Sequence, residues 1–225
     1  PTLQNPTSAI MSETRRREIA AIAERHDIAI IEDDIYGMLV DERPLPLAHF
    51  APERTWYATS LAKSAGCGLR VGFLVPPRTQ IERARAILHG QGQTVPPLMA
   101  ELAARLIVSG DAAAICRNIM SEMRERHALT EKALGGHPLT AHPASLYVWL
   151  ELPLEWRAHA FVEAARARGI AIAAGEDFMV GRMDRASRHV RLAIGQPLTR
   201  AELKRGLDVV AALLSEAHIV MAVPA

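Results

Sequence analysis

The run Ile28–Ile31 constrains the fold more than any other part of this sequence, because it is short, apolar and unbroken. Such a run is typical of a strand that is buried on both faces of a parallel sheet. It ends in Glu32, Asp33 and Asp34, and α/β sheets place ligand-binding groups just beyond the carboxyl ends of their strands. We therefore expect an α/β domain whose functional groups follow this strand.

Further helices and strands are expected to alternate up to about residue 115. The expected helices cover residues 12–26, 79–88, 97–108 and 111–134, the last of which continues past residue 115, and the expected strands cover 56–60 and 71–75. The helix over 79–88 opens with Thr79 and Glu82, which have the spacing of a capping box.

The pattern changes in the second half of the chain. Apolar residues alternate from Leu146 to Leu152, which predicts a strand with one buried face. The other expected elements are a helix over 156–168, strands over 170–174 and 189–194, and a last helix that opens with Thr199 and Glu202. We expect two domains: the C-terminal part of a large α/β domain with a parallel-type sheet (1–115) and a small α+β domain (116–225).

Composition argues against several function classes. The 26 basic and 25 acidic residues give a formal charge of +1, which is no electrostatic footprint for nucleic acid. No apolar run is long enough to span a bilayer, so we expect no membrane partner. Cys67 and Cys116 lie far apart without metal-ligand spacing, which indicates reduced thiols in a cytoplasmic protein. The histidines form no ligand motif either, so we expect no metal site.

Lys63 is the lysine most suited to chemistry among the three in the sequence. Lys132 and Lys204 fall on charged helical faces, where solvation is the simpler interpretation. Lys63 follows the strand that ends at Ser60, and a lysine after a buried strand can be partly desolvated, which frees its amine for Schiff-base chemistry. On spacing alone, a lysine in a solvated turn remains the more common case.

The segments Ser60-Leu61-Ala62-Lys63 and Gly68-Leu69-Arg70-Val71-Gly72 together resemble the cofactor signature of the fold-type I, class I/II aminotransferases. The resemblance implies the fold of the pyridoxal-phosphate-dependent transferases, similar to aspartate aminotransferase. It also implies that Lys63 is the catalytic residue that holds pyridoxal phosphate as an imine. Ser60 and Arg70 would bind the cofactor phosphate, because a hydroxyl and a guanidinium both donate hydrogen bonds to phosphate oxygens.

The segment from Asp33 to Tyr36 resembles the D-x-x-Y element of the same family. In that family the aspartate pairs with the pyridine nitrogen and the tyrosine donates to the phenolate oxygen of the ring. The resemblance therefore assigns Asp33 and Tyr36 to the cofactor. Asp34 remains an alternative to Asp33, because some relatives have a D-x-Y spacing.

Two segments resemble the substrate-binding parts of the family. The first, Pro1–Thr7, resembles the P-x-x-Q-N-P-T loop, in which Asn5 would bind the phenolate oxygen and lie near the substrate carboxylate. Ser8 stands where a glycine is usual. The second, Val190-Arg191-Leu192, resembles the strand whose arginine binds the α-carboxylate of the substrate. The alternatives to Arg191 are the nearby arginines Arg182, Arg185 and Arg188.

The stretch from Glu32 to Arg54 looks most like the MocR-type regulators of the GntR family. These regulators join an N-terminal winged helix-turn-helix to an aminotransferase-like domain that senses an effector. The resemblance implies a C-terminal fragment of a homodimer that binds an amino acid, another small amine or a 2-oxo acid, with DNA contacts only in an absent N-terminal domain. The alternative is a stand-alone aminotransferase that transfers an amino group between an amino acid and a 2-oxo acid.

Overall fold

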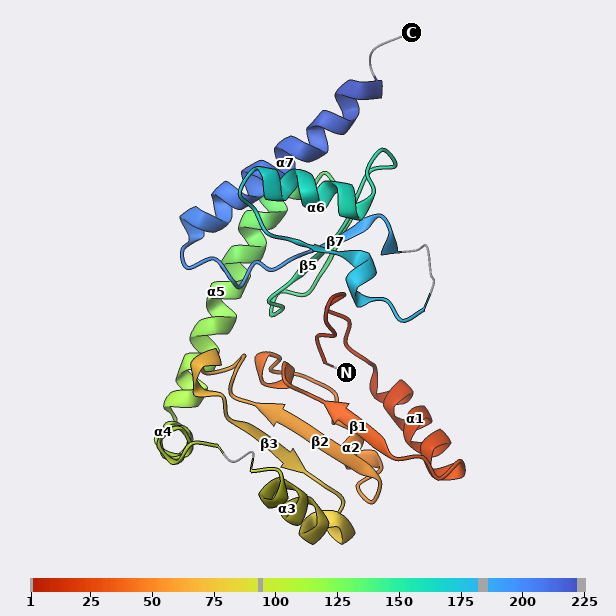
Figure 1. Cartoon of the computed structure of the whole chain (residues 1–225), viewed down its shortest axis with the longest axis vertical. Coiled ribbons are helices and arrows are strands. Elements are labelled where there is room, and N and C mark those ends of the chain that lie inside the picture. The colour runs from red at the N-terminus through yellow and green to blue at the C-terminus, as the bar shows by residue number, and fades with distance from the viewer. Residues whose placement is uncertain (1, 93–94, 182–185, 222–225) are drawn as a thin grey trace. The chain divides into compact units, whose positions relative to one another are not determined.

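The computed structural model describes residues 2–92, 95–181 and 186–221, which divide into two compact units (Figure 1). Unit 1 contains the described residues up to Gln4 together with Ala9–Met120, and unit 2 contains Asn5–Ser8 together with the described residues from Ser121 onward. The expected domain limits, 1–115 and 116–225, stay a prediction.

Unit 1 contains a three-stranded sheet in the order β1–β2–β3. Its strands are β1 (Ile30–Asp33), β2 (Thr55–Ser60) and β3 (Gly72–Val75). β1 and β2 run parallel, as expected, whereas β3 runs antiparallel to β2. The N–H of Leu61 donates to the carbonyl of Val71 (3.2 Å). The chain therefore turns directly back after β2, without the crossover that a parallel pair needs.

The first strand differs from the expectation in its start and in its burial. It begins at Ile30, because the N–H of Ile28 still bonds to a carbonyl of the preceding helix (2.8 Å). Ile31 is 83% exposed, whereas Glu32 is buried, so the prediction of a strand covered on both faces is wrong for the described residues. The alternation places Asp33 on the exposed face together with Ile31.

The helices of unit 1 are α1 (Glu13–Arg25), α2 (Leu47–Phe50), α3 (Ile81–Gly90), α4 (Pro97–Val108) and the first part of α5 (Asp111–Leu134). The capping box predicted at Thr79 and Glu82 is wrong. A 3₁₀ turn follows Pro77, whose carbonyl accepts from the N–H of Gln80 (2.8 Å). Thr79 therefore lies inside a turn, and α3 begins only at Ile81, without a side-chain cap.

A buried ion pair joins α1 to β1. The side chains of Arg16 and Glu32 are almost fully buried, and Nη1 of Arg16 lies 3.3 Å from Oε1 of Glu32. Glu32 also accepts from two N–H groups at the start of α2 (2.8 and 2.9 Å). Arg16 donates from Nε to the carbonyl of Met11 and from Nη2 to the hydroxyl of Thr2 (3.0 Å each). Both charges therefore have hydrogen-bond partners within unit 1.

Unit 2 contains an antiparallel sheet in the order β4–β5–β7–β6. Its strands are β4 (Leu139–Ala141), β5 (Val148–Glu151), β6 (Ala173–Ala174) and β7 (His189–Leu192). The strands expected over 170–174 and 189–194 are thus present but shorter, and β4 was not predicted. The helices of the unit are α6 (Ala158–Ala167), α7 (Arg200–Met221) and the remainder of α5.

The two faces of the β5–β7 pair have different roles. One face is apolar and is covered by α6 and α7 (Figure 1). Its core residues include Val148, Leu150, Val190, Leu192, Phe161, Leu207 and Leu213. The other face carries Trp149, His189 and Arg191, because side chains alternate along a strand.

The start of α7 confirms the expected capping box. The N–H of Glu202 donates to the hydroxyl of Thr199 (3.1 Å), and the N–H of Thr199 donates to the carboxylate of Glu202 (3.3 Å). The first helical residue, Arg200, forms an ion pair with Glu122 of α5 (2.7 Å), which also binds Arg126 (2.7 Å). Hydrogen bonds from Arg200 and Arg126 lower the pKa of Glu122 to about 2.

This ion pair predicts a pH dependence of stability. Unfolded Glu122 takes up a proton near its ordinary pKa of 4.5, whereas folded Glu122 does so only near 2. The free energy of unfolding should therefore fall as the pH drops between these two values. Glu122→Gln should make the fall shallower in urea titrations at a series of pH values. Arg200→Gln, which removes the larger cause of the shift, should act in the same direction; slopes equal to the wild type would contradict this account.

Candidate functional site

Asp33 and Ser60 lie at the same edge and on the same face of the sheet in unit 1. Asp33 pairs with Ala58, and Ser60 lies two residues beyond Ala58 on β2, so the two side chains project from one face. Both residues end their strands, and parallel strands have their carboxyl ends at one edge. This is the edge at which α/β sheets bind ligands.

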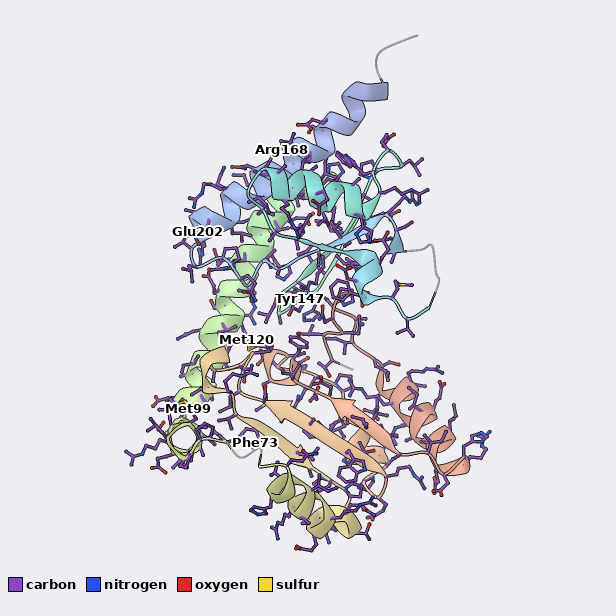
Figure 2. The ribbon with its side chains drawn as sticks, viewed as in Figure 1. Phe73, Met99, Met120, Tyr147, Arg168 and Glu202 are labelled. Atoms are coloured by element: carbon purple, nitrogen blue, oxygen red, sulfur yellow. The ribbon has the colours of Figure 1, made fainter. Side chains whose placement is uncertain are left out.

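A closed loop after β2 carries Lys63. The N–H groups of Ala65 and Gly66 both donate to the carbonyl of Leu61 (2.9 Å each), which forms a turn around the half-buried Lys63. A small apolar core holds the loop, with Met99 packed against its buried residues Leu61, Leu69, Val71 and Ala103 (Figure 2). The structure therefore fixes the backbone on both sides of the lysine.

Arg70 belongs to the base of the same loop. Ser60 pairs with Gly72 across β2 and β3, and Arg70 precedes Gly72 by two residues. Arg70 is exposed and has a left-handed backbone (φ 53°). Among the described residues, no atom lies within 4 Å of the point where a Cβ would stand on Gly66 or Gly68. The loop thus presents a hydroxyl, a guanidinium and open backbone, a donor set that suits a phosphate group.

The two neighbouring aspartates have different surroundings. Asp34 is buried, and its Oδ2 accepts from Nη1 of Arg43 (2.6 Å) and from the hydroxyl of Tyr57 (2.8 Å). Burial, and after it the carboxylate of Asp34, raises the pKa of Tyr57 to about 12. Asp33 is exposed, and its Oδ1 accepts a hydrogen bond from the turn that follows (3.2 Å). The accessible carboxylate is therefore that of Asp33, which supports Asp33 over Asp34 as the partner of a ring nitrogen.

Tyr36 lies in the turn that this network holds. The N–H of Gly37 donates to the carbonyl of Asp34 (3.1 Å). A Cβ on Gly37 would collide with Nη1 of Arg43 and Oδ2 of Asp34, so the turn beside Tyr36 requires a glycine. The ion pair of Asp34 with Arg43 thus holds the backbone that carries both Asp33 and Tyr36.

Asn5 and Arg191 come together in unit 2. Nη1 of Arg191 donates to Oδ1 of Asn5 (2.9 Å), and the bond between Asn5 and Pro6 is cis. The central carbon of the Arg191 guanidinium lies 4.5 Å from the ring centre of Tyr147 and 4.7 Å from that of Phe178. The sequence analysis did not single out Phe178, because a contact between residues 13 positions apart leaves no periodic signal.

Ser8 holds the Asn5 segment within unit 2. Its backbone is left-handed (φ 61°), a conformation in which glycine is favoured. Its hydroxyl donates to that of Ser145 (2.7 Å), which also accepts from the N–H of Tyr147 (3.1 Å). Burial lowers the pKa of His127, so the ring is neutral at pH 7 and its Nε2 donates to the carbonyl of Ser145 (2.8 Å). The presence of a serine where a glycine is usual was the sequence signal for the contact between Ser8 and Ser145.

The alternatives to Arg191 are distinguished in part. Arg188 forms an ion pair with Glu151 at the surface (3.5 Å). Arg182 and Arg185 lie outside the described residues, as does Pro1. In the part of the chain that the structure covers, no group of three or more histidine, cysteine or acidic side chains could hold a metal ion. None of the described helices has the length and apolar character that a membrane span needs.

Comparison with known proteins gives a matching family and a similar relative. The model of the family described as aminotransferase class I and II matches residues 1–210. The uncharacterised HTH-type transcriptional regulator YdeF of Bacillus subtilis is 34% identical over 217 residues, which are 96% of this chain and 46% of that protein. The chain thus spans about half the length of this relative.

Solved structures share the fold. An archaeal alanine:glyoxylate aminotransferase superposes with a TM-score of 0.84 at 24% identity, covering 96% of this chain and 55% of that one. The α-aminoadipate aminotransferase LysN of Thermus thermophilus, solved with N-(5'-phosphopyridoxyl)-L-leucine, gives a TM-score of 0.81 at 22% identity and covers 98% of this chain and 58% of that one. The expected fold class is therefore confirmed.

Proposed function

This chain belongs to the class I and II aminotransferase family, and on that premise we propose that it is the effector-sensing domain of a MocR-type regulator of the GntR family. The observation that carries the proposal is the likeness of almost the whole chain to an HTH-type regulator. In this proposal the intact protein is a cytoplasmic homodimer, and its DNA contacts belong to a winged helix-turn-helix outside this chain.

Pyridoxal phosphate is the cofactor of the family, and it supplies a reactive carbonyl carbon and an electron-withdrawing ring. We assign its attachment to the amine of Lys63 and its phosphate to Ser60 and Arg70. The exposed carboxylate of Asp33 suits the protonated ring nitrogen, because an adjacent negative charge stabilises the protonated form. Tyr36 would donate to the phenolate oxygen of the ring.

The ligand in this proposal is an amino acid or a related small amine or 2-oxo acid. Arg191 suits an α-carboxylate, because its planar guanidinium can donate two parallel hydrogen bonds. Asn5 accepts a hydrogen bond from one end of that guanidinium (2.9 Å) and so limits its rotation. We also assign Asn5 to a second contact, with the phenolate oxygen of the cofactor. The signal to the DNA-binding part would come from a difference in ligand affinity between two conformations of the whole protein.

The second candidate is a stand-alone aminotransferase, and the shared fold with solved aminotransferases favours it. In that case Lys63 has a second role. Its freed amine would take a proton from the ligand Cα as a general base and would then donate that proton as a general acid. The two candidates use the same residues and differ in turnover and in DNA binding.

One set of measurements on the complete, cofactor-loaded protein separates them. A panel of amino acids is titrated by cofactor absorbance, transamination is assayed with each, and binding to the DNA upstream of the gene is followed at several salt concentrations. The regulator should show salt-dependent DNA binding that one amino acid changes, with negligible turnover. Robust turnover with one donor–acceptor pair and no salt-dependent DNA binding would decide for the enzyme.

The same titration tests Arg191. Arg191→Leu should weaken amino acid binding about tenfold to hundredfold, because hydrogen bonds to charged groups contribute about 1.5–3 kcal/mol. Arg188→Leu is the matched control, since Arg188 precedes β7 and pairs with Glu151 at the surface. Equal affinities of the wild type and Arg191→Leu would remove Arg191 from the site.

A further inference from the structure

The guanidinium of Arg191 lies over two aromatic rings. Tyr147 and Phe178 each place a ring centre within 5 Å of its central carbon, at 4.5 and 4.7 Å. Tyr147 is buried, and Figure 2 labels it on the segment that leads into β5. A cation over the face of an aromatic ring is attracted by the negative charge density of that face.

The second ring also contacts other aromatic side chains of unit 2. Phe178 packs edge-on against Trp149 (6.1 Å between centroids, 83°), and Trp149 stacks on His189 (5.2 Å, 10°). Trp149 is also the register partner of Arg191 between β5 and β7. Phe178 is therefore held by Trp149 as well as by Arg191.

The edges of the guanidinium are not equivalent. Nη1 donates to Asn5 (2.9 Å), and Nε is buried without a hydrogen-bond partner among the described residues. An arginine has five N–H donors in one plane, and the contacts with the two rings and with Asn5 together limit the movement of that plane. Arg191 is thus ordered before a ligand arrives, so the loss of side-chain conformational entropy on binding is smaller.

We infer that Tyr147 and Phe178 are positioning residues that give the site its selectivity for ligands with an α-carboxylate. The inference rests on the proposed role of Arg191. It assigns to the two rings an effect on carboxylate recognition alone, since both rings contact the guanidinium of Arg191.

The test compares two ligands that differ only in the carboxylate, L-alanine and ethylamine, by absorbance titration of the cofactor-loaded protein. Tyr147→Leu and Phe178→Leu should each raise the Kd of L-alanine about fivefold to thirtyfold, and leave the Kd of ethylamine unchanged. Tyr147→Phe keeps the ring and should restore the wild-type Kd of L-alanine. Urea titration of each variant verifies that it is folded under the assay conditions.

Two outcomes overturn the inference in different ways. If the leucine variants shift both ligands equally, or neither, the rings do not act through Arg191, and the proposed function stands without them. If wild-type protein shows no difference between L-alanine and ethylamine, there is no carboxylate site, and the inference falls together with that part of the proposed function.

Discussion

Replacing Lys63 with alanine should abolish covalent attachment of pyridoxal phosphate and leave the fold intact. The attachment needs a primary amine, and Lys63 is the one lysine of unit 1; the others, Lys132 and Lys204, belong to unit 2. The side chain of Lys63 is half-buried in a turn that is held by backbone hydrogen bonds to the carbonyl of Leu61 and by a hydrogen bond to the hydroxyl of Ser60. Truncation therefore leaves the turn and the apolar core below it in place.

Borohydride reduction followed by mass spectrometry measures this attachment directly. The wild type should gain the mass of one reduced cofactor per chain, and Lys63→Ala should gain none. Lys204→Ala is the control, because Lys204 forms an exposed ion pair with Asp208 on α7 (2.9 Å). A cofactor adduct that persists in Lys63→Ala would show that another amine is used, and loss of the circular dichroism signal would show that Lys63 is structural.

Arg16→Ala should lower the free energy of unfolding by about 3–5 kcal/mol, the cost of leaving one member of a buried ion pair without its partner. The side chains of Arg16 and Glu32 are 1% and 2% exposed, so the variant leaves the charge of Glu32 buried without its guanidinium partner. The variant also loses the hydrogen bonds of Arg16 to Met11 and Thr2 (3.0 Å each). Urea or thermal denaturation of the wild type and the variant measures the difference.

The neighbouring residue provides a matched control on the same helix. Arg15 forms an ion pair with Glu18 one turn away (2.9 Å), and both side chains are more than half exposed, at 60% and 52%. Arg15→Ala should therefore change the free energy of unfolding by no more than about 0.5 kcal/mol. Similar losses for Arg16→Ala and Arg15→Ala would mean that the pair of Arg16 and Glu32 contributes no more to stability than an exposed ion pair.

Helix α1 could be predicted from the sequence, but the burial of its side chains could not. The helix expected over 12–26 is present as α1. Its apolar residue Ile22 is 43% exposed, whereas Arg16 is buried. A helical period identifies a face, but the burial of a charge depends on a partner from another element, here Glu32.

The same limit applies to strands and to the candidate site. The strand after Leu61 was placed correctly, but its direction depends on the hydrogen bond between Leu61 and Val71, which no local pattern encodes. Lys63 and Arg70 could be singled out because their motif is continuous in sequence. Phe178 could not, because its contact with Arg191 exists only in the folded chain.

The assignment of Asn5–Ser8 to unit 2 has a practical consequence for dissecting the gene. The polypeptide enters unit 2 at Asn5, leaves it after Ser8 and returns at Ser121, so no single cut separates the two units. A fragment expressed from Ser121 onward would contain Arg191 and both aromatic rings around it, but neither its asparagine partner nor the serine that binds Ser145. A faithful isolated unit would need the Asn5–Ser8 tetrapeptide grafted back, by fusion to a new terminus or as a synthetic peptide.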